Sequence, residues 1–99
     1  MQRGGCIYIV TNKTHSVLYT GVTSDIIGMI SDHKNKTYPQ SFTAKYKCNK
    51  LVYYLFYAHI EEAIAAEKAL KGGNKQAKIN LINGLNPGWV DLYDDLIKE

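Results

Sequence analysis

The stretch CIYIVTNKTHSVLYTG, residues 6–21, places two segments rich in β-branched and aromatic residues on either side of a polar loop. Such segments favour strands, and the Asn, Thr and Lys of the loop suit a turn, so the stretch predicts a β-hairpin. Adjacent strands lie about 4.8 Å apart, so Tyr8 and Tyr19 on one face would present both phenol oxygens to one pocket. The alternative is two half-buried strand tyrosines whose hydroxyls are hydrogen-bonded or hydrated.

A helix is predicted to begin directly after the hairpin. Residues 23–25, Thr-Ser-Asp, supply N-cap side chains for a helix that runs to about residue 35. Residues 29 and 33 of this helix lie one turn apart on the same stripe. Met29 and His33 are therefore expected to face the same way.

The next segments predict a connection and a third strand. Residues 36–50 contain a proline and several polar side chains and are expected to form an irregular connection. KLVYYLFYA, residues 50–58, is typical of a strand, and its continuous apolar character indicates a central position covered on both faces.

A second long helix is predicted over HIEEAIAAEKALKGG, residues 59–73, because acidic residues lie near its start and lysines and two glycines near its end. Its expected buried face contains Ile60, Ala63, Ile64, Ala66 and Leu70. Glu67 lies at the edge of that face. Its carboxylate is expected either to reach water at the rim or to face a cleft and bind a cation.

The C-terminal part predicts two further segments. A short helix is expected over residues 74–83, and an amphipathic segment, WVDLYDDLIKE, is expected to pack Trp89, Leu92 and Leu96.

Size and composition predict one soluble domain, residues 1–99. The three strands and the helices predicted above place it in the α+β class, with a small three-stranded, mainly antiparallel sheet flanked by helices. The chain has 99 residues, of which 45% are hydrophobic, enough for one modest core. No apolar run is long enough to span a bilayer, and residues 1–5 carry no secretory apolar stretch, so we expect no membrane association and a cytoplasmic location. Cys6 and Cys48 show no zinc-ligand spacing and are expected to be buried or half-buried free thiols.

Positive charge is concentrated in the first half of the chain. Residues 1–50 carry a net charge of +5 and residues 51–99 carry −2, although the whole chain has only +3. The basic excess comes largely from Lys34, Lys36, Lys45, Lys47 and Lys50, with Tyr38, Phe42 and Tyr46 among them. Lysines that neutralise phosphates and rings that stack on bases suit nucleic-acid binding. The alternative is a solvated lysine-rich loop whose aromatic residues hold it to the core.

CIY, with Tyr8, is followed eleven residues later by YTG, with Tyr19. Further stretches follow in order: LYTGVTSD (18–25), DHK (32–34), SFTAKY (41–46), KLVYY (50–54), EEAIAAEKALKGG (61–73), LINGLNPGW (81–89) and DLYDDL (91–96). The first two look like the two-part signature of the GIY-YIG nuclease superfamily, and the others resemble the same family in its small, single-domain bacterial form. The sequence is similar to the N-terminal catalytic domain of the bacterial excinuclease.

The resemblance implies an active site for phosphodiester hydrolysis. Carried over to this sequence, the catalytic residues are Tyr8, Tyr19, His33 and Glu67. Glu67 would hold a divalent metal ion, Mg²⁺ or Mn²⁺, which stabilises the leaving oxygen, and Tyr19 or His33 would act as base or relay. Expected substrate contacts are Asn86, which follows from the resemblance, and Lys34, Lys36, Lys45 and Lys47, which follow from the charge pattern. The implied substrate is DNA, and the implied setting includes DNA repair.

One catalytic group of the family pattern is missing. An arginine is expected ten residues after Tyr19, where this chain has Met29. Loss of such a charged donor commonly costs about 10²- to 10³-fold in rate. Arg3 is the only arginine in the chain. Lys34 or Lys45 could approach from another side, but a lysine supplies a point charge without the bidentate fork.

Three functions therefore remain open at the level of sequence. The first is a nuclease-type domain that binds DNA and cleaves it slowly or not at all because Met29 replaces the arginine. The second is an active, metal-dependent DNA endonuclease in which another cation replaces the arginine. The third is a protein-interaction or inhibitor module built on the same fold.

Overall fold

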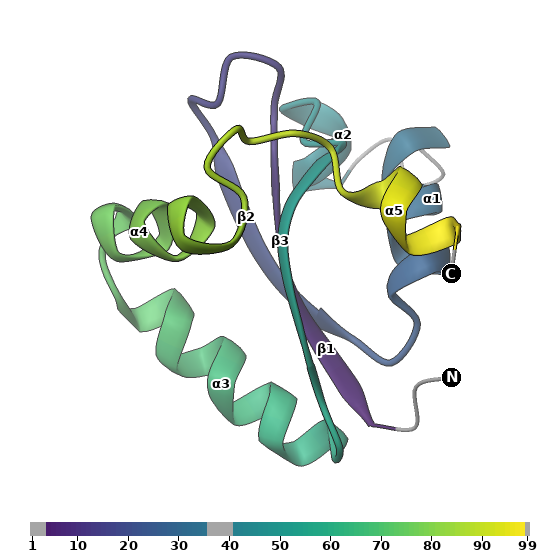
Figure 1. Cartoon of the computed structure of the whole chain (residues 1–99), viewed down its shortest axis with the longest axis vertical. Coiled ribbons are helices and arrows are strands. Elements are labelled where there is room, and N and C mark those ends of the chain that lie inside the picture. The colour runs from purple at the N-terminus through teal and green to yellow at the C-terminus, as the bar shows by residue number, and fades with distance from the viewer. Residues whose placement is uncertain (1–3, 36–40, 99) are drawn as a thin grey trace.

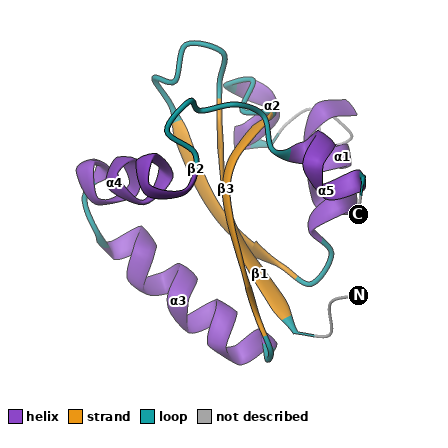
Figure 2. Ribbon diagram, viewed as in Figure 1, coloured by secondary structure: helices purple, strands orange, loops and turns teal. Residues whose placement is uncertain are grey.

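The hairpin of residues 6–21 forms the middle and one edge of a three-stranded sheet. The computed structural model describes residues 4–35 and 41–98. Its strands are β1 (Gly5–Thr11), β2 (Leu18–Thr23) and β3 (Lys50–Tyr57) (Figure 2). They pair in the order β2-β1-β3, and both pairs are antiparallel. The expected α+β architecture and the hairpin are confirmed.

The central strand is β1, so the prediction that β3 lies in the centre is wrong. Every residue of β1 is buried, whereas Leu55 in the second half of β3 is 43% exposed. The continuous apolar run of β3 has another cause: helices cover both faces of the sheet even at this edge. Leu51 packs into the core on one face, and Val52 packs into the core on the other.

The helices form a layer on each face of the sheet, as Figure 1 shows. On one face, α1 (Ile26–Asn35) and α5 (Tyr93–Ile97) pack against Cys6, Tyr8 and Val10 of β1. On the other face, α3 (Ile60–Gly72) and α4 (Lys75–Leu85) pack against Ile7 and Ile9. Successive side chains of β1 point to opposite faces of the sheet, so the core consists of two halves, one on each face.

The N-cap predicted for α1 is confirmed, and α4 lies where a short helix was expected. The Asp25 carboxylate accepts a hydrogen bond from the Gly28 amide (3.1 Å), as an N-cap does, and the Asn74 side chain caps α4 through the Ala77 amide (2.8 Å). Helix α4 extends two residues beyond the expected end. At the C-terminus Leu96 is buried, and Leu92 and Trp89 pack against the core, as predicted.

The connection after α1 is more regular than predicted. A short helix, α2 (Phe42–Lys45), begins after Ser41, whose hydroxyl accepts a hydrogen bond from the Ala44 amide. This N-cap supports a single turn within a polar segment. Lys36 and Tyr38 lie outside the described residues.

The predicted buried face of α3 is wrong in one respect. Ile64 is 38% exposed, whereas Glu67 is only 8% exposed. The helix is therefore turned so that a carboxylate, and not an apolar side chain, faces inward at this level. Of the two environments expected for Glu67, the structure places it facing a cleft.

Both cysteines are free and buried, as expected. Burial raises the pKa of the Cys6 thiol to about 12, so it stays protonated at neutral pH. Among the described helices, none has the length and apolar character needed to cross a bilayer.

Candidate active site

A pocket of about 360 Å³ brings together the four expected catalytic residues and Met29. Because β2 is an edge strand, side chains from both helical layers can meet beside it. Side chains of β1, β2, α1 and α3 line the pocket: Tyr8, Tyr19, Met29, His33 and Glu67. Met29 and His33, which were expected to face the same way from α1, both line the pocket. Three further polar residues that the sequence did not single out also line it: Ser41, Thr43 and Lys71.

The absence of a side chain at Gly21 leaves room for the Tyr8 ring to reach the pocket. Tyr8 on β1 pairs with Gly21 on β2, and a Cβ at Gly21 would overlap the Tyr8 phenol. The missing side chain therefore lets the ring lie across the neighbouring strand toward its outer edge. The Tyr8 and Tyr19 rings are 6.5 Å apart, although Tyr19 pairs with Val10 and is not directly opposite Tyr8.

His33 is held between two hydroxyl groups. Its Nδ1 lies 2.8 Å from the Thr43 Oγ1, and its Nε2 lies 3.5 Å from the Tyr8 Oη, the outer limit of hydrogen bonding. When the Tyr8 hydroxyl donates to Nε2, the proton of the neutral ring sits on Nδ1 and is donated to Thr43. Thr43 is buried, so it fixes the orientation of the ring.

Burial sets the protonation states of this pair. It lowers the pKa of His33 below its ordinary value, against a smaller opposing effect of Asp32. Burial, with a smaller contribution from neighbouring Tyr19, raises the pKa of the Tyr8 phenol far above its ordinary value. At neutral pH the site therefore offers a neutral imidazole, which accepts a proton, beside a protonated phenol, which donates one.

Lys71 places a positive charge in the same pocket. Its Nζ lies 2.7 Å from the Glu67 Oε2, one helical turn earlier, and 5.7 Å from the centre of the Tyr19 ring. The hydrogen bond to Glu67 raises the pKa of Lys71, so the ammonium is fully charged at neutral pH. A carboxylate and a cation thus lie side by side, and the half-exposed Lys71 can turn toward a ligand.

The donor set fits a hard cation held by few protein ligands. Within residues 4–35 and 41–98 no three His, Cys, Asp or Glu side chains form a metal-binding group, which argues against a closed zinc-type site. Mg²⁺, in contrast, is often held by one or two carboxylates together with waters and substrate phosphates. Glu67, nearly buried at the pocket wall, is suited to that role.

The expected substrate-contacting residues are dispersed. Lys34 forms an ion pair with Asp91 and donates to the Asn49 carbonyl (2.9 Å), so its charge is already neutralised within the fold. Asn86 does not line the pocket. It is buried, and its amide fastens the loop before α5 to β3 through the carbonyl groups of Val52 and Val90. Both side chains thus have structural partners that the sequence did not reveal.

Three further lysines of the predicted basic surface do not line this pocket: Lys45, Lys47 and Lys50. Lys45 and Lys47 are exposed, and Lys50 donates a hydrogen bond to His15 (3.0 Å). Lys36 falls among the residues that the structure does not describe.

The chain is similar to a known protein family. A family model described as the GIY-YIG catalytic domain matches residues 4–80, more than half of the chain. The chain belongs to this family. No curated protein and no solved structure matches it significantly. GIY-YIG domains are metal-dependent nucleases that act on nucleic acids and generally use a divalent ion, so this chain carries a nuclease-type domain.

Lys71 is the feature of this GIY-YIG domain that sequence reasoning missed. The sequence suggests Lys34 and Lys45 as substitutes for the missing arginine, and neither lines the pocket. The relevant signal is the spacing of four residues between Glu67 and Lys71, which places both side chains on one face of a helix. That face lines the pocket only because α3 is oriented about its axis with Glu67, and not Ile64, facing inward.

Proposed function

We propose that this chain is an active, divalent-metal-dependent DNA endonuclease in which Lys71 supplies the charge that the missing arginine would provide. The observation that carries the proposal is the position of Lys71 Nζ, in one pocket with Glu67, Tyr19 and Met29. Preorganised positive charge aimed at a phosphate is among the largest contributions to phosphoryl-transfer catalysis. The absence of arginine at residue 29 therefore does not leave the pocket without a cation.

Glu67 would hold the metal ion, and Lys71 would then turn from Glu67 to the substrate. A divalent ion at Glu67 would stabilise the charge on the phosphate and on the leaving oxygen. Lys71, relieved of its ion pair, would bind a non-bridging oxygen of the scissile phosphate. The Glu67–Lys71 pair of the free protein thus keeps both groups near their proposed positions at little cost.

His33 would remove the proton from the attacking water. Attack of the water oxygen forms a new bond to phosphorus and breaks the bond to the leaving sugar oxygen, while the water proton passes to Nε2. Thr43 keeps Nδ1 protonated and the ring in place. The Tyr8 phenol, held in its protonated form by burial, donates to Nε2 in the free protein and to a phosphate oxygen in the complex.

The direct test is nicking of supercoiled plasmid by the purified wild-type protein. We expect nicking in Mg²⁺ or Mn²⁺ and none in excess EDTA, because the phosphate charge is then unbalanced. Heat-treated protein from the same preparation is the control for a contaminating nuclease. Nicking that survives EDTA would contradict the metal requirement.

A second candidate function rests on Met29. Methionine offers no donor at a position where it lines the pocket, and a lysine cannot form the bidentate contacts of arginine. If the wild-type protein binds DNA but does not nick it in any divalent ion, the better description is a DNA-binding domain with weakened or lost catalysis.

The pH dependence of nicking reports on His33. Because burial lowers the pKa of His33, the imidazole is neutral at pH 7 and becomes protonated only as the pH falls below about 6.5. The rate is therefore expected to be constant from about pH 7 to pH 8 and to fall on the acid side, with a midpoint below about 6.5. Initial nicking rates from pH 5 to pH 8 at constant ionic strength measure this. A midpoint above pH 7 would argue against His33 as the proton acceptor.

A further inference from the structure

Aromatic side chains continue from the candidate active site across the surface of α2. The Tyr19 ring, in the pocket, lies 5.6 Å from the Phe42 ring, and Phe42 lies 4.6 Å from Tyr46. Phe42 is 46% exposed and Tyr46 is 48% exposed. The three rings form a row that leads out of the pocket onto an exposed surface.

The exposed rings are not needed to anchor α2. Thr43 and Cys48, which are both buried, hold this turn against the core, and the Cys48 amide donates to the Thr43 carbonyl (2.7 Å). Ser41 caps the start of the turn. Phe42 and Tyr46 therefore expose apolar area at a site where packing does not require it, which is typical of a binding surface.

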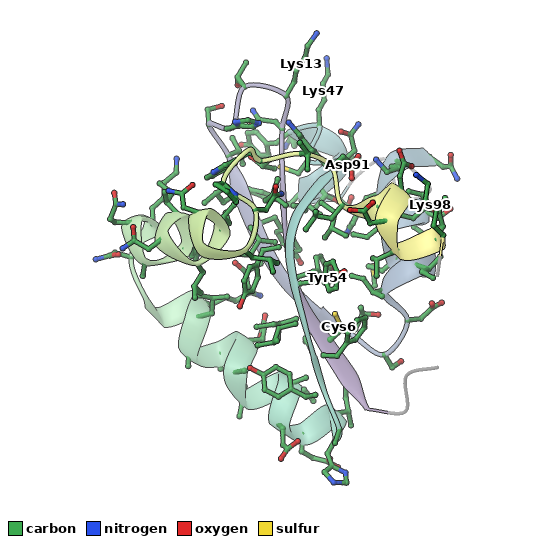
Figure 3. The ribbon with its side chains drawn as sticks, in the orientation of Figure 1. Cys6, Lys13, Lys47, Tyr54, Asp91 and Lys98 are labelled. Carbon is green, nitrogen blue, oxygen red and sulfur yellow. The ribbon has the colours of Figure 1, made fainter. Side chains whose placement is uncertain are left out.

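A second hollow lies at the outer end of this row. It has a volume of about 650 Å³, is open to solvent, and lies between the turn of the β1–β2 hairpin and the segment that enters β3. Tyr46 lines it together with three lysines, Lys13, Lys47 and Lys50. Lys13 and Lys47 project from the same end of the molecule (Figure 3).

The electrostatics of this hollow favour an anion. Lys13 and Lys47 are exposed, and neither forms an ion pair with another residue in the described part of the chain. Asp91 is the only acidic residue among the described lining residues, and its charge is neutralised by Lys34. The net charge of the lining is therefore positive.

We propose that the Phe42–Tyr46 rings and the Lys13/Lys47/Lys50 hollow form a second binding site, which takes unpaired nucleotides of the strand whose phosphate lies in the candidate active site. The rings would stack on bases and the lysines would bind the phosphates that follow. Bases in a duplex are already stacked and paired, so an exposed aromatic pair of this kind selects an unpaired segment. This inference rests on the proposed function of the pocket and adds a preference for substrate structure.

The test measures binding in EDTA, where cleavage does not interfere. The probes are a fluorescein-labelled oligothymidylate and a duplex of equal length, followed by fluorescence anisotropy over a salt series. We expect the single strand to bind more tightly than the duplex. Tyr46→Leu should weaken binding of the single strand by about 5- to 30-fold, since it removes one stacking surface, whereas Tyr46→Phe should bind as the wild type does.

The lysines are tested through the salt dependence. Lys47→Ala should reduce the slope of log K against log salt by about 0.7, the value for one phosphate contact on a single strand. Lys98→Ala removes an exposed lysine at the end of α5 (Figure 3) that lines neither hollow. It is the matched control and should leave the slope unchanged.

The outcomes separate this inference from the proposed function. Equal binding of oligothymidylate by wild type and Tyr46→Leu, or tighter binding of the duplex, overturns the second site even if the protein nicks plasmid. Weakened binding by Tyr46→Leu with retained binding by Tyr46→Phe supports the site, even if no metal ion produces nicking and the catalytic proposal fails.

Discussion

Glu67→Gln is expected to lower Mg²⁺-dependent nicking by about 10²- to 10³-fold. The amide has nearly the shape of the carboxylate and can still accept a hydrogen bond from Lys71, but it carries no charge to hold a divalent ion. Because Glu67 is only 8% exposed and lines the pocket, few other groups can take over this role. Initial rates of plasmid nicking at saturating Mg²⁺ measure the loss.

A second measurement separates metal binding from folding. Titration calorimetry with Mn²⁺ should detect binding to the wild type and none to Glu67→Gln, while circular dichroism should be the same for both. Glu61→Gln removes a carboxylate from the exposed first turn of the same helix and is the control. Unchanged Mn²⁺ binding in Glu67→Gln would place the metal elsewhere, and full nicking activity would exclude Glu67 from the active site.

Lys71→Met is expected to lower nicking by about 10²-fold, and Met29→Arg should recover most of that loss in the Lys71→Met protein. Met29 lies on α1, one turn before His33, and Lys71 reaches the pocket from α3, so the two positions approach the same space from opposite layers. An arginine at residue 29 would return the cation from the side on which the family pattern places it.

The same pair of substitutions distinguishes the two nuclease hypotheses. If Lys71 already supplies the charge, Met29→Arg alone should change the wild-type rate little. A large gain from Met29→Arg alone would instead show that Met29 is the catalytic defect and that Lys71 does not compensate for it. Met29→Leu, which retains an apolar side chain of similar volume, is the control for repacking against the α1 core.

Removal of Glu67 tests whether the recovered activity uses the same site. In Lys71→Met/Met29→Arg, the added Glu67→Ala should abolish nicking, because the arginine balances charge on the phosphate but does not hold the metal ion. Nicking that persists in the triple variant would mean that the arginine had created a different reaction path.

Local sequence was sufficient for most elements and for half of the site. The β-branched segments around TNKTH specify the hairpin, Asp25 begins α1, and the helical repeat aligns Met29 with His33. These features depend on residues within a few positions of one another, so short-range periodicity and capping reveal them. The signature residues Tyr8, Tyr19 and Gly21 follow from the same stretch.

Only the tertiary structure decided which charged and polar side chains bind partners within the fold and which face the pocket. The sequence placed Lys34 on a basic surface, but in the folded chain its charge is neutralised by Asp91. Asn86 was expected to contact substrate, but its side-chain amide donates a hydrogen bond to the Val52 carbonyl of β3. In both cases the partner comes from a distant segment of the chain. Strand order likewise depended on how the helical layers cover the sheet and not on the apolar run of β3. On α3, Ala63 packs against the sheet, and Glu67 and Lys71 follow on the same helical stripe, so Glu67 is buried and Lys71 reaches the Tyr19 ring. A charge pattern shows which side chains are charged, but the free energy of burying each charge depends on the partners that the fold supplies.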